Sequence, residues 1–227
     1  MTYLELCVRL VQEARISGTG PVSVIGQTGE MLLVTQWINT ALQNLWGKYG
    51  QWQFARFDFS FPTISGVSTY PSTAAVPDLL RWITDDTESM RCWRTSIGST
   101  DERYLIPISW DDFRDVRLFS TSRTQTGTPL EYAVKPNNDL IFWPIPDDTY
   151  TISGEFYCSV TSLVNNSDVP AFPADFHMLI VWEALRLTGA YQKSPENYMH
   201  GQAEYRRMLN QIRRQYLLPV DTGMPLA

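Results

Sequence analysis

The chain has 227 residues, of which 44% are hydrophobic and 19% charged, a composition typical of a globular protein with one large or two small domains. Its formal net charge of −6 and sequence pI of about 4.9 disfavour nucleic-acid binding, because phosphate contacts need clustered lysine and arginine. No segment approaches the roughly 20 apolar residues that span a bilayer, and the three isolated cysteines indicate a reducing compartment.

Two amphipathic helices are predicted at the start of the chain. Apolar residues at three- and four-residue spacing predict a helix over residues 3–15. A glycine-rich loop leads to the clearest helical pattern in the sequence, an apolar stripe over residues 34–49. The segment Gly20–Gly26 has the glycines of a phosphate-binding loop, but five residues separate them instead of four and Gln27 replaces the lysine. We therefore expect no nucleotide site there.

From residue 51 the apolar period changes from helical to two. Phe57, Phe59 and Phe61 alternate with polar residues, which is the pattern of a half-buried strand. Ser109, followed by acidic residues, predicts a capped helix start. Further strands are predicted over residues 90–95, 103–107, 130–135, 140–143 and 150–161. The last three follow one another through turns rich in proline and aspartate, so they predict a β-meander.

Two helices are predicted near the C-terminal end. The first begins around Phe176 and ends near Gly189. The second begins at Ser194, the expected cap, with Pro195 in its first turn, and ends by Pro219. Prolines and a glycine make the residues that follow unsuitable for helix, so we expect them to be extended.

The order of these elements predicts an α+β fold. The N- and C-terminal helices, in residues 1–50 and 170–218, are expected to form a helical bundle. An antiparallel β-rich domain is inserted between them over residues 51–169, and residues 219–227 are expected to form an extended tail.

The sequence offers little for catalysis or metal binding. His177 and His200 have no second histidine or cysteine at ligand spacing, so we expect no metal and no cofactor. Acidic pairs at Asp85–Asp86, Asp111–Asp112 and Asp147–Asp148 have tryptophans nearby, as a glycosidase cleft would. All three pairs fall at predicted turns or helix starts, where aspartate bonds the backbone. We therefore expect a protein that is not an enzyme.

The last predicted helix is the most basic segment of the chain. Arg206, Arg207, Arg213 and Arg214 repeat at a spacing of seven and lie on one side of the helix. Because the chain as a whole is acidic, this side fits an acidic partner protein better than nucleic acid. A solvated helix face is the alternative.

Three stretches of the sequence resemble the head–tail adaptor (connector) proteins of tailed bacteriophages. They are residues 2–21 continuing through 26–30 and Trp37; residues 132–140 with 143–146; and residues 168–170, 176–180 and 204–209. The resemblance spans nearly the full length and is weakest over residues 66–128.

This resemblance implies a structural virion protein of the head–tail junction, made in the host cytoplasm. Family members form a ring, commonly of twelve copies, beneath the portal protein. The ring extends a channel through which double-stranded DNA passes without specific binding, and it docks tail or nozzle proteins; no membrane is involved. The residues implied to bind the portal are Arg213, Arg214, Tyr216, Leu217, Leu218 and Pro219. A tail or baseplate carbohydrate-binding module, using the tryptophans, is the alternative function.

Overall fold

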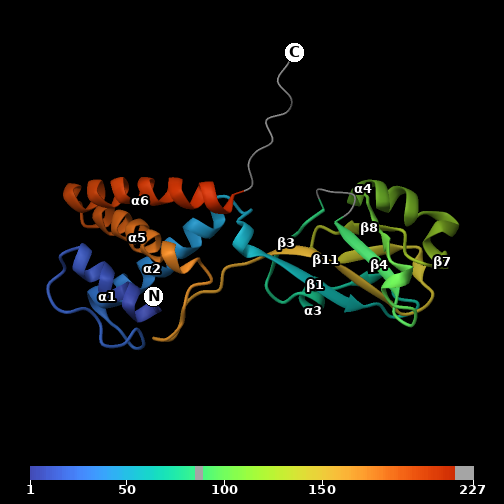
Figure 1. The fold of residues 1–227 in the computed structure, drawn as a ribbon, viewed down its shortest axis with the longest axis horizontal. Coiled ribbons are helices and arrows are strands. Elements are labelled where there is room, and N and C mark those ends of the chain that lie inside the picture. The colour runs from blue at the N-terminus through green and yellow to red at the C-terminus, as the bar shows by residue number, and fades with distance from the viewer. Residues whose placement is uncertain (85–88, 218–227) are drawn as a thin grey trace, which may run out of the picture. The chain divides into compact units, whose positions relative to one another are not determined.

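The computed structural model describes residues 1–84 and 89–217, and these form two compact units (Figure 1). The helical unit consists of Met1–Ala55 together with residues 160–217, and the inserted unit is Arg56–Ser159. Helices at both ends and a largely antiparallel sheet region between them confirm the predicted α+β fold. The predicted tail, residues 219–227, and the Asp85–Asp86 pair lie outside the described residues.

Four helices build the helical unit. They are α1 (Tyr3–Glu13), α2 (Gly29–Gly47), α5 (His177–Tyr191) and α6 (Pro195–Tyr216), with short 3-10 turns η1 (Gln53–Ala55) and η5 (Ala174–Phe176). Thr2 and Glu5 start α1 with a reciprocal capping box. The apolar stripe of α2 is buried from Val34 to Trp46, as its period predicts. In Figure 1, α6 lies along α5 on the outer side of this unit.

The turn between α5 and α6 differs in two details from the sequence prediction. Gly189 does not end α5, which continues to Tyr191. A Cβ on Gly189 would lie 2.5 Å from the Tyr198 backbone nitrogen, so this glycine allows close helix approach instead of ending the helix. Ser194 does occupy the cap position of α6, but its side chain makes no cap hydrogen bond; its carbonyl oxygen accepts from the Tyr198 N–H at 3.1 Å.

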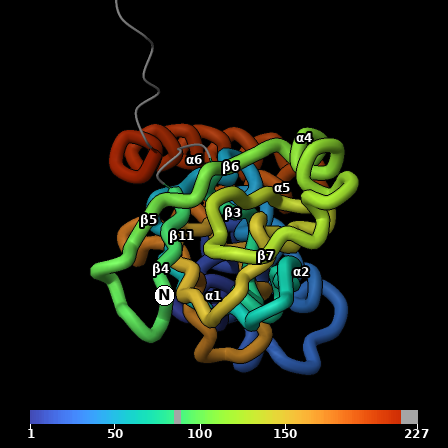
Figure 2. Tube along the Cα trace, turned by 90° about the vertical axis from the view of Figure 1, so that its right-hand side faces the viewer, coloured from blue at the N-terminus to red at the C-terminus, as the bar shows by residue number. Residues whose placement is uncertain are grey.

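The inserted unit contains two main sheets and one short parallel pair (Figures 1 and 2). The first sheet has the order β1 (Arg56–Pro62), β11 (Tyr150–Cys158), β4 (Met90–Arg94), β5 (Arg103–Tyr104), with β3 (Leu79–Trp82) also pairing β11. The second has the order β2 (Thr69–Tyr70), β9 (Leu140–Trp143), β8 (Glu131–Val134), β6 (Ile106–Pro107). The short pair is β7 (Thr126–Gly127) with β10 (Ile145–Pro146). The remaining turns are α3 (Ser72–Ala75), η2 (Ser99–Asp101), α4 (Trp110–Asp112), a π-turn (Phe113–Arg117) and η4 (Ser120–Thr124).

One hydrophobic core lies between the two main sheets and contains side chains from both. Two predictions about the strands, the three-stranded meander and the single strand over residues 103–107, are wrong because their segments divide between these sheets. The predicted meander holds only for β8 and β9, since β11 pairs with β1, β3 and β4 of the other sheet. Gly154 of β11 favours this place, because a Cβ there would lie 3.0 Å from the Phe59 ring and the Met90 side chain. The predicted strand 103–107 divides at fully buried Leu105, and its halves enter different sheets.

Candidate functional site

The C-terminal end of α6 carries the residues implied to bind the portal, and the structure gives them different environments. Arg213 and Arg214 are exposed, whereas Tyr216 and Leu217 are half-buried. Leu218 and Pro219 lie outside the described residues. The Leu217 N–H donates to the Arg213 carbonyl oxygen at 3.1 Å, which closes the last turn of the helix.

Tyr216 belongs to an aromatic cluster that holds this helix end on the unit. Its ring lies 5.5 Å from the Phe54 ring and 6.1 Å from the Phe176 ring. Edge-to-face contacts of this kind stabilise by roughly 0.5–1.5 kcal/mol each. The Arg213 guanidinium lies 5.4 Å from the centre of the Tyr49 ring. Arg214 and Leu217 have no such contacts in the described part of the chain, so they are the better candidates for a partner surface.

Exposed arginines continue along α6 toward its middle. Arg207 pairs with Glu204 at 2.7 Å, whereas Arg206 and Arg214 have no ion-pair partner among residues 1–84 and 89–217. The sequence has no acidic residue between Tyr205 and Leu217. We call the exposed side formed by Arg206, Arg207, Arg213 and Arg214 the basic face.

The two units differ in charge. The inserted unit has 15 acidic and 9 basic residues, whereas the rest of the chain has 9 of each. The whole net charge of −6 therefore belongs to the inserted unit, and the basic face lies on a unit that is neutral overall.

A second polar cluster joins α2, α5 and α6. Glu183 is only 2% exposed, and its carboxylate accepts from Arg186 at 2.6 and 2.9 Å. Lys48 donates to the Tyr205 hydroxyl at 2.8 Å, and an open depression of about 430 Å³ lies between these side chains. This ion pair lies within α5; Asn44 of α2 donates to Glu183 at 3.4 Å and the Arg186 guanidinium lies 5.5 Å from the centre of the Tyr205 ring of α6, so the pair contacts both neighbouring helices. The sequence alone did not reveal this cluster, because Glu183 occupies one position of an otherwise apolar helix.

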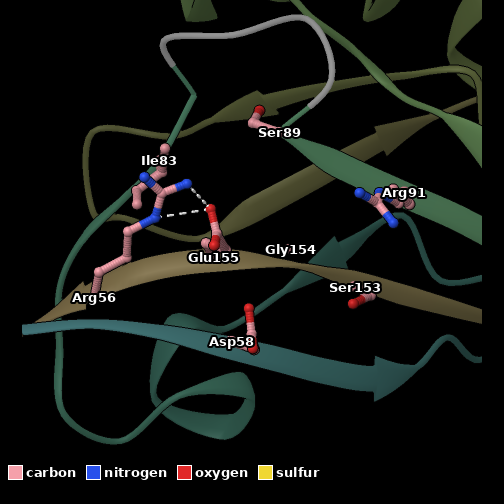
Figure 3. A pocket seen from close by; sticks show the side chains of 8 residues that line it. All are labelled: Arg56, Asp58, Ile83, Ser89, Arg91, Ser153, Gly154 and Glu155. Atoms are coloured by element: carbon pink, nitrogen blue, oxygen red, sulfur yellow. Dashed lines mark hydrogen bonds and ion pairs between the residues drawn. The ribbon is translucent and has the colours of Figure 1, made fainter. Parts of the chain in front are cut away.

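The outer face of the first sheet holds a depression of about 410 Å³ (Figure 3). Arg56 donates through Nε to Glu155 at 2.9 Å, and Asp58 lies opposite Glu155 on the neighbouring strand. Arg91 stands on the other side of the depression and pairs with Glu102 at 3.7 Å. Two guanidinium groups and two carboxylates balance in charge, and the lining has no histidine or cysteine. The arrangement is that of a charged sheet surface on which arginines and carboxylates face one another.

His200 packs against another helix, and two of the three cysteines are buried. His200 packs edge-on against Trp182 with ring centres 5.3 Å apart. Burial raises the pKa of Cys7 and of Cys92 to about 12, so both thiols are protonated and unreactive at neutral pH.

Among residues 1–84 and 89–217, no three His, Cys, Asp or Glu side chains are grouped to hold a metal ion. No helix in the same residues is long and apolar enough to cross a membrane.

His177 gives a prediction about pH. It is buried between the Met1 amino nitrogen, 2.6 Å from Nδ1, and the Phe172 carbonyl oxygen, 2.8 Å from Nε2. Burial, reinforced by the Met1 charge, lowers its pKa below the ordinary value of about 6.5. The unfolded chain therefore binds a proton near pH 6.5 that the folded chain takes up only at lower pH. We expect stability to fall as pH drops below about 6.5, by at most about 1.4 kcal/mol per pH unit.

Urea unfolding between pH 8 and pH 5 measures this dependence. His177→Gln, whose amide can still donate to the Phe172 carbonyl, should flatten the curve just below pH 6.5. An identical slope in His177→Gln and the original chain would show that another group carries the effect.

The tryptophans weigh against the carbohydrate-binding alternative. Trp46, Trp52, Trp82 and Trp182 are buried, and the other four are half-buried. Sugar-binding platforms use exposed aromatic side chains, and all eight tryptophans are buried or half-buried. Of the acidic pairs, Asp111–Asp112 forms the first turn of α4, with Ser109 capping it as predicted. Asp147 accepts a hydrogen bond from the Tyr150 hydroxyl at 2.6 Å.

Two loops of the helical unit present aliphatic side chains to solvent. Val22 is 91% exposed, and Ile25, Val164 and Val169 are each more than half exposed. The loops are held together by Asn166, whose side-chain oxygen accepts from the Val24 N–H at 2.7 Å. Exposed aliphatic groups on ordered loops are typical of surfaces that bury them against a partner.

Comparison with known proteins gives one match. A protein-family model described as "SU10 adaptor protein" matches residues 1–223. A search of curated proteins found no match.

Proposed function

The chain belongs to the SU10 adaptor protein family, a family of phage head–tail adaptors, and from this we propose that it forms a ring beneath the portal. The family is one of structural virion proteins at the head–tail junction, which fits a chain whose polar clusters are ion pairs and caps. The ring, commonly of twelve copies, extends the DNA channel and docks the tail or nozzle proteins.

The match over residues 1–223 carries this proposal, and surface features support it. The exposed aliphatic side chains of the two loops, Val22 among them, gain stability when an assembly buries them. The high charge of the inserted unit, −6, would keep double-stranded DNA moving in the channel without specific binding, since like charges repel.

We assign portal docking to the end of α6 and the residues after it. Arg213 and Arg214 supply positive charge, and Leu217, Leu218 and Pro219 supply an apolar hook suited to a crevice in the portal. Tyr216 fixes the direction of the helix end through Phe54 and Phe176.

Electron microscopy of the purified chain mixed with its cognate portal ring tests the proposal. We expect an added ring of density on one face of the portal, coaxial with the channel. A chain that stays monomeric alone is compatible with this, because the portal can act as a template. Portal rings that carry no added density at micromolar chain concentration would refute the proposal.

A further inference from the structure

An exposed acidic segment stands at the edge of the inserted unit. It comprises α4, the π-turn and the next two residues, Trp110–Phe119, and Figures 1 and 2 both place α4 at the outer margin of this unit. Asp111, Asp112 and Asp115 are exposed. Within residues 1–84 and 89–217 the cation that pairs with this group is Arg114, at 3.2 Å from Asp111 and 2.9 Å from Asp115. The segment therefore presents excess negative charge.

The segment also carries apolar groups with no cover. Phe119 is 71% exposed and Val116 is 55% exposed. Charged and large apolar side chains side by side on a protruding surface are typical of a contact with another protein.

Contacts inside the unit hold the acidic segment in place. Phe113 is almost fully buried in a small cluster with Ala133 and Ile141. Arg117 donates to both oxygens of Glu131 at 2.6 Å and lies 4.0 Å from the centre of the Trp143 ring. Because the surface is ordered before binding, little conformational entropy is lost when a partner docks.

The basic face of α6 has the opposite character. Its four arginines are exposed, and Arg206 has no ion-pair partner in the described residues. Arg206 and Arg207 lie two turns before Arg213 and Arg214, outside the helix end that we assign to the portal. Arg207 bonds Glu204 on the same helix but is itself exposed, so both guanidinium groups are accessible to another surface.

We propose that the acidic segment of one copy docks on Arg206 and Arg207 of the next copy in the ring. This inference rests on the proposed ring. A ring of identical chains needs two different, complementary surfaces on each chain. The acidic segment and the basic face are such a pair, because their charges are opposite and they belong to different units of the chain. The contact also offsets the repulsion between neighbouring inserted units, each of which carries −6.

Charge reversal on each side tests the contact. One variant carries Arg206→Glu and Arg207→Glu; the other carries Asp111→Lys and Asp115→Lys. Since like charges then face each other, each variant alone should need about tenfold more chain to form rings on the portal, and the defect should shrink at high salt. Arg15→Glu with Lys193→Glu makes the same charge change as the arginine variant, at other exposed positions of the helical unit, and should assemble normally. Circular dichroism checks that every variant is folded.

Mixing the two variants identifies the partner. In a ring with an even number of copies the two variants can alternate. Each lysine-bearing segment then faces a glutamate-bearing helix, and each unchanged segment faces unchanged arginines. An equimolar mixture should therefore form rings at the chain concentration that the unaltered protein needs. A single chain that carries all four substitutions should also recover. Recovery of that chain but not of the mixture would place the contact within one copy and overturn the inference. Normal assembly of either variant alone would also overturn it. Failure of the unaltered chain to form rings would refute the proposed function as well.

Discussion

Replacing Gly189 by alanine is expected to destabilise the helical unit by about 3 kcal/mol, near the upper end of the usual cost of overpacking. A Cβ at this position would lie 2.5 Å from the Tyr198 backbone nitrogen and 2.9 Å from its Cα. Both atoms are backbone, so no side-chain rotation relieves the contact and α6 must move away from α5. That movement separates Trp182 from His200 and Arg186 from Tyr205, which join the two helices.

Chemical denaturation of the full chain measures the effect. Gly47→Ala at the end of α2 is the matched control, because its Cβ meets nothing within 4 Å. There alanine should stabilise by up to about 1 kcal/mol through helix propensity. Gly201→Ala, whose Cβ would lie 3.0 Å from the Arg186 nitrogen, should be destabilised less than Gly189→Ala. Equal stability of Gly189→Ala and Gly47→Ala would mean that the two helices do not pack this closely.

The sequence predicted the helices well because helical periodicity is a local signal. The α2 stripe and the capped start of α4 both follow from residues within a few positions of one another. The sequence places the end of α5 two residues early, near Gly189 instead of at Tyr191, because glycine has two uses that look alike in a sequence. At Gly189 the missing side chain admits the backbone of another helix, and only the tertiary structure shows which use applies.

Strand partners were harder to predict than the strands themselves. Alternation places β11 correctly over most of its length but says nothing of its neighbours. Those neighbours come from β1, β3 and β4, which lie roughly 60 to 100 residues earlier in the chain, and Gly154 accepts their side chains. Residues near in sequence, such as β9, pair with β8 instead. The choice of neighbouring strand therefore depends on how side chains from the whole core pack together, and a turn between two strands does not determine it.

The candidate site was predicted in part. The arginines of α6 are exposed, as their spacing indicates, and this could be inferred from the helix repeat. The role of Tyr216 could not be inferred, because its partners Phe54 and Phe176 come from distant segments. Glu183 was missed for the same reason: Arg186 is near in sequence, but the residues that bury the pair belong to other helices.

Replacing Leu217 and Leu218 together by aspartate is expected to weaken binding to the portal ring about a hundredfold or more. Two apolar anchors that enter a crevice each contribute about 2 kcal/mol, and a carboxylate placed there pays a desolvation cost in addition. Stability should change little, because Leu217 is only half-buried and the α6 contacts of Ile212 and Tyr216 are kept. Binding to immobilised portal rings, measured alongside thermal unfolding, checks both expectations.

Two further changes separate portal contact from helix anchoring. Gln12→Asp with Gln36→Asp adds the same charge to exposed positions of α1 and α2, away from the basic face, and should bind about as well as the original chain. Tyr216→Ala should lower both the unfolding temperature and portal binding, because it removes the ring contacts with Phe54 and Phe176. Portal binding that survives the double leucine change would place the docking surface elsewhere on the chain. Loss of binding at constant stability would mean that the helical unit holds α6 rigid while the residues beyond Tyr216 make the contact.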